Sequence, residues 1–154
     1  MRAVRTVLSV SVGLLFSGVT LSTVAAAEFG TADEARAMLE RAVAAIQENK
    51  EQALSDFNAG AEGYREKDLY VFCVDEAGNF TAHGGDQDLL GESIVALQDH
   101  TGERFGGEIY GNAVEGEFVE VDYSWPRPDG SEPVEKATFV TKVDDQICAV
   151  GYYK

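Results

Sequence analysis

One of the two histidines in this chain precedes two closely spaced aspartates. His83 is followed by Asp86 and Asp88, whereas His100 lies in a predicted turn. An imidazole beside two carboxylates could bind a metal ion or carry out acid–base chemistry. A single histidine next to glycines in a loop is more often an ordinary polar residue, so a metal-binding or hydrolytic site at these positions is an alternative interpretation.

The sequence contains none of the short motifs that mark serine hydrolases, zinc proteases, phosphate-binding loops or dinucleotide-binding folds. Adjacent acids such as Asp144 and Asp145 arise by chance in so acidic a chain and are typical of a hairpin turn. The segment from Asp75 to Asn79 lacks the spaced oxygen ligands of a calcium loop. We therefore expect a protein that is not an enzyme and that needs no cofactor and no metal.

Two aromatic residues and one lysine lie on predicted strands. Tyr123 and Trp125 are two positions apart, so they share one face of a strand, and Lys136 begins a later strand. Taken alone, their types and spacing indicate ordinary structural roles, namely cross-strand aromatic packing and an exposed lysine paired with a neighbouring carboxylate.

The hydrophobic pattern predicts the elements that would position these residues. Thr31 and Glu34 have the spacing of a capping box, so a helix is expected to begin there and to continue to Phe57, loosened near Asn49-Lys50. Alternating strands are expected over 69–74, 80–82, 118–124, 136–143 and 146–153, with short helical segments between the second and third. A long helix before a five-stranded antiparallel sheet predicts an α+β fold.

Several segments match a known pattern in their order and spacing. They are the run 69–75, Gly78-Asn79 followed by 81–83, Tyr123-Ser124-Trp125-Pro126, the run 136–140 and the closing run 150–153. Together they resemble the single Cache domain of the second type, an extracytoplasmic, PAS-like module that senses small molecules. The resemblance covers the chain from Ala32 to the C-terminus, and Tyr-x-Trp-Pro is its best single motif.

The resemblance implies a ligand pocket with one basic residue. Lys136, three residues before the aromatic Phe139, would meet the carboxylate of a small organic acid, and His83 would lie at the mouth of the pocket. The family commonly has His-Pro at this point, whereas here His83 is followed by Gly84. The loop is therefore expected to differ in shape from that of the family.

The resemblance also implies the walls of the pocket. Tyr123 and Trp125 would form part of the wall, and Tyr70 and Phe72, which share one face of the first strand, would contribute from the facing strand. The long helix is expected to pack on the opposite face of the sheet, through Leu39, Val43, Ile46 and Leu54.

Cys73 and Cys148 are the only cysteines, and an even count permits one disulfide in an oxidising compartment. Two buried thiols are the alternative. In the strand order of the resembled family the first and last strands are neighbours, which implies that these cysteines are close enough to bridge. The bond would lie on the face opposite Tyr70 and Phe72.

Residues 1–27 have the plan of a secretory signal peptide. Arg2 and Arg5 precede an apolar core, and Ala25-Ala26-Ala27 supplies small residues before a cleavage site. We expect cleavage after Ala27, a single ligand-binding domain over 28–154, and a periplasmic or secreted location. An uncleaved membrane anchor is the alternative.

The composition excludes some partners. The chain has 27 acidic and 12 basic residues and a net charge of −15, and the predicted signal peptide contains none of the acids. So acidic a surface repels nucleic acid and anionic membranes and favours solubility.

These features predict an exported sensor-type domain that binds a small molecule, with a short organic acid as the expected ligand. Because the sequence ends at Lys154, directly after the last strand, we expect a standalone form that acts as a soluble binder or hands its signal to an unidentified membrane sensor. The alternatives are the metal-binding or hydrolytic protein described above and a degenerate structural or interaction domain.

Overall fold

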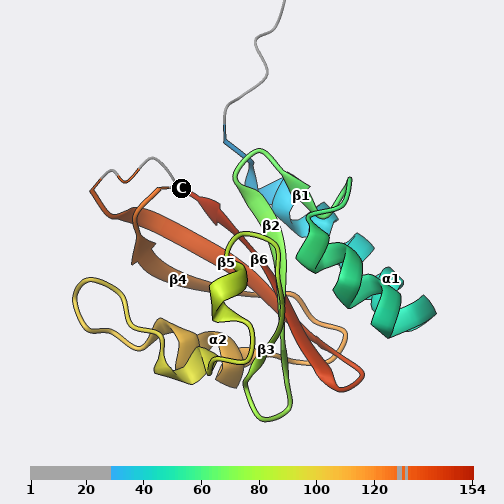
Figure 1. Cartoon of the computed structure of the whole chain (residues 1–154). Helices are drawn as coiled ribbons and strands as arrows, with labels where there is room; N and C mark the ends of the chain where they lie inside the picture. The colour runs from blue at the N-terminus through green and yellow to red at the C-terminus, as the bar shows by residue number, and fades with distance from the viewer. Residues whose placement is uncertain (1–28, 128–129, 131) are drawn as a thin grey trace, which may run out of the picture.

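A computed structural model describes residues 29–127, 130 and 132–154 (Figure 1). The predicted signal peptide at 1–27 and its cleavage site lie outside these residues. Among the described residues, no helix has the length and apolar character needed to cross a bilayer.

The elements follow one another in the expected α+β order. They are α1 (Ala32–Ala59), β1 (Arg65–Glu66), β2 (Leu69–Asp75), β3 (Phe80–His83), the 3-10 helices η1 (Gln87–Leu89) and η2 (Ile94–Ala96), α2 (Phe105–Asn112), β4 (Val119–Trp125), β5 (Val134–Val143) and β6 (Gln146–Tyr153).

The strands form one antiparallel sheet in the order β1-β2-β6-β5-β4, and β3 pairs with β2. Every strand predicted from the alternating pattern is present, which confirms the predicted fold class. The structure contains one strand that the sequence did not predict, β1, because two residues are too few to give an alternating pattern. The first and last long strands, β2 and β6, are neighbours as the resemblance implied.

Helix α1 begins and bends where the sequence predicts. The Thr31 hydroxyl accepts from the Glu34 backbone N–H at 3.2 Å, and the Glu34 carboxylate accepts from the Thr31 N–H at 2.8 Å. Asn49 has non-helical dihedrals (φ −157°, ψ 95°), and its side chain accepts from the Gln52 N–H at 3.2 Å. Asn49 therefore caps a second helical segment, which ends at the left-handed Gly60.

The alternation of the strands divides the core into two layers. Val71 and Cys73 of β2 face α1, whereas Phe72 and Val74 face the side covered by η2 and α2. Figure 1 shows α1 on one face of the sheet and α2 on the other. The second layer contains the aromatic residues of β2 and β4 and surrounds the site described below.

The predicted apolar stripe of α1 packs on the sheet. Leu39 and Ile46 are fully buried, and Val43 and Leu54 are half-buried against the same cluster. Ile46→Ala removes buried methyl groups and should lower the free energy of unfolding by about 2–5 kcal/mol. The matched control, Gln47→Ala on the exposed side of the same helix, should change it by less than about 0.5 kcal/mol. Both are measured by denaturant unfolding, and a loss below about 1 kcal/mol at Ile46 would contradict its role in the core.

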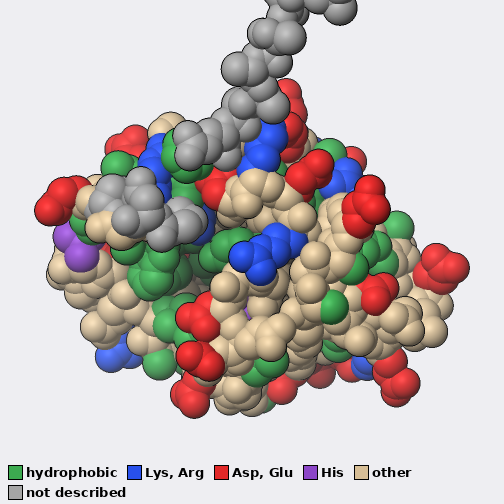
Figure 2. Space-filling view, turned by 45° about the horizontal axis from the view of Figure 1, so that its top comes forward, with side chains coloured by type: hydrophobic (Ala, Val, Ile, Leu, Met, Phe, Trp, Pro, Cys, Tyr) green, Lys and Arg blue, Asp and Glu red, His purple; other side chains and the backbone are tan. Residues whose placement is uncertain are grey.

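The surface is strongly acidic. Figure 2 shows Asp and Glu side chains spread over the visible face, with basic side chains between them. Several of the basic residues form surface ion pairs, such as Lys50 with Asp145 at 2.7 Å and Lys67 with Glu34 at 2.6 Å. Exposed pairs of this kind contribute little to stability.

Candidate functional site

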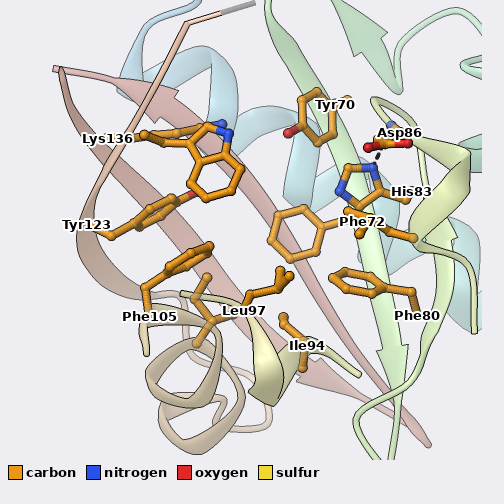
Figure 3. A pocket seen from close by; sticks show the side chains of 13 residues that line it. Tyr70, Phe72, Phe80, His83, Asp86, Ile94, Leu97, Phe105, Tyr123 and Lys136 are labelled. Atoms are coloured by element: carbon orange, nitrogen blue, oxygen red, sulfur yellow. Dashed lines mark hydrogen bonds between the residues drawn. The ribbon is translucent and has the colours of Figure 1, made fainter. Parts of the chain in front are cut away.

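A cavity of about 110 Å³ lies between the sheet and the elements that cover its second face (Figure 3). The structure brings to this cavity every residue that the resemblance assigns to a pocket. They are Tyr70 and Phe72 from β2, His83 from β3, Tyr123 and Trp125 from β4, and Lys136 from β5.

The covering elements supply apolar residues that sequence reasoning did not assign to the site. Ile94 and Leu97 come from η2 and its end, and Phe105 comes from the start of α2. A Cβ atom at Gly106 would overlap the backbone carbonyl of Ile94, so only glycine allows α2 to pack this closely on η2. That contact holds Phe105 over Tyr123, and no periodicity in the sequence signals it.

Lys136 is buried, with only 3% of its surface exposed. Its Nζ lies 4.7 Å from the centre of the Tyr153 ring and 5.4 Å from that of Tyr70. Among the described residues, no ion pair includes Lys136. The alternative of an exposed lysine paired with a neighbouring acid is therefore wrong.

Burial sets the charge state of Lys136. Loss of solvent lowers the pKa of its ammonium to about 8, and the carboxylate of Asp68 opposes this shift. Lys136 therefore remains mostly protonated at pH 7. The aromatic faces of Tyr70 and Tyr153 offer a cation–π environment to the charge, which compensates only part of its desolvation.

His83 is held as a neutral hydrogen-bond donor. Its Nδ1 accepts from the backbone N–H of Asp86 at 2.8 Å, and a neutral imidazole then carries its proton on Nε2. Burial lowers the pKa of the imidazole to about 4, so the ring is uncharged at pH 7. In Figure 3 the nitrogen that is not bonded to Asp86 faces the cavity.

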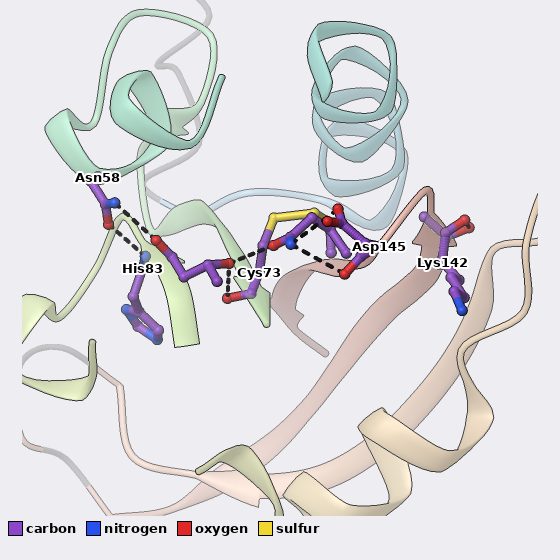
Figure 4. Close-up of a disulfide and its surroundings, with 9 residues drawn as sticks. Asn58, Cys73, His83, Lys142 and Asp145 are labelled. Carbon is purple, nitrogen blue, oxygen red and sulfur yellow. Dashed lines mark hydrogen bonds between the residues drawn. A yellow bond between two sulfur atoms is a disulfide. The ribbon is translucent and has the colours of Figure 1, made fainter. Parts of the chain in front are cut away.

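Asn58, near the end of α1, fixes the backbone around His83. Its Oδ1 accepts from the His83 N–H at 3.0 Å, and its Nδ2 donates to the Thr81 carbonyl at 3.1 Å (Figure 4). The side chain thus satisfies backbone groups of β3 as a neighbouring strand would. Sequence reasoning missed Asn58 because an asparagine at the end of a helix gives no sign of a partner so far along the chain.

The loop after His83 uses the backbone N–H of Gly84, at the position where the resemblance implied a proline. The Gly84 N–H donates to the Val71 carbonyl at 2.9 Å, and a proline has no N–H to donate. A Cβ atom at Gly85 would lie 2.7 Å from the ring of Tyr70. The glycines therefore let the loop pack directly on Tyr70 at the edge of the cavity.

The two tyrosines of the site are neutral. Burial raises the pKa of Tyr70 to about 12, and it also raises the pKa of Tyr123. The Tyr123 hydroxyl lies 3.0 Å from Thr138 Oγ1, and its ring stacks on Phe105 with centroids 4.3 Å apart. Trp125 meets Phe105 edge-on at 5.3 Å, so aromatic contacts keep this wall rigid.

Phe72 and Tyr70 pack around the imidazole. The Phe72 ring stacks on His83 at 5.6 Å, and the Tyr70 ring lies 5.0 Å from it. Together with the Phe80 ring at 5.3 Å, they surround the imidazole with aromatic groups, and this burial disfavours its charged form.

Asp86 and Asp88 do not join His83 in a metal site. The Asp86 side chain accepts from the Asp88 N–H at 3.0 Å, which caps η1. Within residues 29–127 and 132–154, no group of three or more His, Cys, Asp or Glu side chains is arranged to hold a metal ion.

Cys73 and Cys148 form a disulfide. They lie directly opposite each other on β2 and β6, with Cα atoms 4.1 Å apart (Figure 4). Both are fully buried in the layer under α1, on the face opposite the cavity. The alternative of free thiols is therefore wrong, and the bond joins the central strands without entering the site.

Comparison with solved structures finds chemotaxis sensor domains with the same fold. One is a methyl-accepting chemotaxis protein from Vibrio parahaemolyticus, 23% identical, with a TM-score of 0.63 over 79% of this chain and 86% of that one. A periplasmic sensor domain of a chemotaxis protein is 22% identical, with a TM-score of 0.58 over 79% and 88% of the two chains.

A third solved structure is a Cache chemosensory domain from a structural study of carboxylic acid recognition. It is 21% identical, with a TM-score of 0.55 over 75% of this chain and 83% of that one. Comparison with curated proteins finds no match. The family model for single Cache domain 2 matches residues 26–152. This chain therefore belongs to the single Cache domain 2 family, whose members are extracytoplasmic sensor domains for small molecules.

Proposed function

We propose that this protein is an exported sensor domain that binds a short monocarboxylate and does no chemistry on it. The proposal rests on one observation: the charged ammonium of Lys136 is buried at the wall of a cavity whose other lining residues are mostly apolar and aromatic. A buried charge is costly unless an opposite charge compensates it. A carboxylate in the cavity supplies that charge.

The size of the cavity limits the ligand. Its volume of about 110 Å³ is smaller than the engineered cavity of about 150 Å³ that accepts benzene. An acid of about two to four carbons fits this limit, by comparison with the six carbons of benzene.

The polar groups around the cavity suit a carboxylate. The Lys136 ammonium supplies the charge, and the Nε2–H of His83 and the hydroxyl of Tyr70 supply neutral donors. Aromatic rings around them exclude water, which strengthens each interaction. The similarity to a Cache domain studied for carboxylic acid recognition also supports this ligand class.

A thermal-shift screen tests the proposal. The oxidised protein is heated with formate, acetate, propionate, butyrate, lactate and pyruvate, with acetamide as an uncharged control, and with amino acids and divalent metal ions. At a hundredfold excess over Kd a ligand should stabilise the protein by about 2.7 kcal/mol. Stabilisation by metal ions alone would favour the metal-binding alternative, and no stabilisation by any compound would favour a degenerate domain.

The affinity for the acid should fall as the pH rises. The carboxylate binds protonated Lys136, and in the free protein burial holds the pKa of this lysine at about 8. Affinity should therefore be constant from pH 6 to 7 and fall above pH 8 by about tenfold per pH unit. Calorimetric titrations from pH 6 to 9 measure this fall. The Lys136→Arg control keeps its charge throughout, and equal affinity of the wild type at pH 7 and 9 would contradict the prediction.

The proposal includes export and processing. The signal peptide at 1–27 is cleaved after Ala27, and the domain over 28–154 then acts as a soluble binder or contacts a membrane sensor. The intact mass of the protein recovered from the exporting cell tests this, since a mass that retains residues 1–27 contradicts cleavage.

A further inference from the structure

We propose that Gly151 sets the height of the Lys136 ammonium above the sheet, and thereby the length of the carboxylate that the cavity accepts. This inference rests on the proposed function, because it concerns the specificity of the same site.

Gly151 is the position on β6 over which the lysine side chain passes. It pairs with Thr138 of β5, two residues from Lys136, and belongs to the face of β6 that looks into the cavity. The Nζ of Lys136 reaches the ring of Tyr70 on β2, and β6 lies between β5 and β2. The lysine therefore crosses β6, and the missing side chain at Gly151 leaves room for it.

The space above Gly151 is already filled. A Cβ atom at this position would lie 2.8 Å from Lys136 Cε, 2.8 Å from Thr138 Oγ1 and 3.4 Å from the Tyr123 hydroxyl. Real Cβ atoms essentially never approach neighbours closer than 3.0 Å. Gly151 is not among the described glycines with positive φ, so it is the room and not the backbone conformation that requires glycine here.

Lys136 yields more easily than Thr138 when a side chain is added at Gly151. Thr138 is fully buried and β-branched, and its hydroxyl is bonded to Tyr123, whose ring is stacked on Phe105. The end of a lysine side chain rotates freely by comparison. Side chains in a strand stand nearly perpendicular to the sheet, so a methyl group at Gly151 would push the lysine away from the sheet and into the cavity.

If the Lys136 ammonium lies farther from the sheet, the space that remains in the cavity accepts only a shorter carboxylate. Each methylene of an acid that fits an apolar cavity raises its affinity about fourfold. In Gly151→Ala the longest acid that the wild type binds well should lose at least tenfold in affinity. The acid one carbon shorter should lose less than threefold, so the preferred chain length falls by one carbon.

The experiment titrates formate, acetate, propionate and butyrate into the wild type, Gly151→Ala and a control, by calorimetry and by the fluorescence of Trp125. The control is Gly111→Ala, where a new Cβ atom meets nothing within 4 Å. It should leave the affinity series unchanged. Far-UV circular dichroism checks that each variant is folded.

The possible results separate the inference from the proposed function. If the wild type binds none of the acids, the proposed function fails. If the wild type binds them and Gly151→Ala has the same length profile, or loses all acids equally, the inference about Gly151 fails and the function stands. An equal loss would mean that the lysine turned away toward the acidic hollow formed by Asp99, Asp122 and Glu135, which Lys136 also lines.

A measurement on the wild type does not depend on the Gly151 variant. The proposal requires a nuclear Overhauser effect between the Gly151 Hα and Lys136 Hε protons, with the lysine signal assigned from Lys136→Met. Absence of this contact in the folded, assigned protein would overturn the inference even if Gly151→Ala did not fold.

Discussion

Lys136→Met should abolish measurable binding of a short carboxylate, with a loss of about 2–5 kcal/mol of binding free energy. Methionine keeps much of the length and apolar character of the lysine stem and removes the charge, so the ligand would meet a buried site with no counter-charge. Lys136→Ala should lose binding to a similar extent. Lys136→Arg should also weaken binding, because a planar guanidinium does not fit a site shaped for a point charge.

Lys136→Met should not weaken the stability of the ligand-free protein, although it weakens ligand binding. Burial lowers the pKa of Lys136 to about 8, which means that the folded protein disfavours its charge. Burying a charge that no opposite charge compensates is costly, so replacing it by an apolar residue of similar size should leave the folded state equally stable or more stable. Lys136→Met should therefore unfold at the same or a higher denaturant concentration than the wild type.

Loss of binding together with unchanged or higher stability distinguishes a residue that binds the ligand from one that is needed for folding. Denaturant unfolding of the free protein and calorimetry with acetate or propionate give the two quantities. A Lys136→Met protein that is folded and still binds the acid within threefold of the wild type would disprove the role of the lysine. A variant that loses both stability and binding would instead identify Lys136 as a residue required for folding.

Removal of the disulfide should cost about 4 kcal/mol of unfolding free energy. Cys73 and Cys148 are 75 positions apart, and closing so long a loop removes much entropy from the unfolded chain. The variant that tests this is Cys73→Ala/Cys148→Ala, which leaves no unpaired thiol in the core. Its denaturation midpoint should fall well below that of the oxidised wild type.

Ligand affinity should be unchanged in the double variant at temperatures where it is folded. The bond lies in the layer under α1, on the face of the sheet opposite the cavity. A reducing agent should destabilise the wild type and have no effect on the double variant. Equal stability of the oxidised wild type and the double variant would show that the disulfide contributes nothing to the fold.

The cavity is also connected to the opposite face of the sheet. Asn58 belongs to the second segment of α1, beyond the bend at Asn49, and it bonds directly to the backbone of His83. Lys50, at the start of that segment, pairs with Asp145 in the turn between β5 and β6. The second segment of α1 is thus attached both to the wall of the cavity and to the hairpin that carries Lys136.

Sequence patterns determined the elements because they depend on neighbouring residues. The reciprocal bonds of Thr31 and Glu34 span one helical turn, so the capping box could be recognised directly. The alternation in β2 likewise placed Tyr70 and Phe72 on one face and Cys73 on the other. Resemblance to a family supplied what the patterns could not, namely which of these faces surrounds a cavity.

Read with its family resemblance, then, the sequence determined the α+β fold, the strand faces and six of the side chains that line the cavity, namely Tyr70, Phe72, His83, Tyr123, Trp125 and Lys136. Only the tertiary structure decided that Lys136 is buried, that His83 Nδ1 accepts a hydrogen bond from Asp86, and that Gly151 leaves room for the lysine. Each of these depends on a backbone or side-chain atom whose position the packing of the whole chain sets. Burial and close contact are properties of packing between distant segments, and no local pattern of residues encodes them.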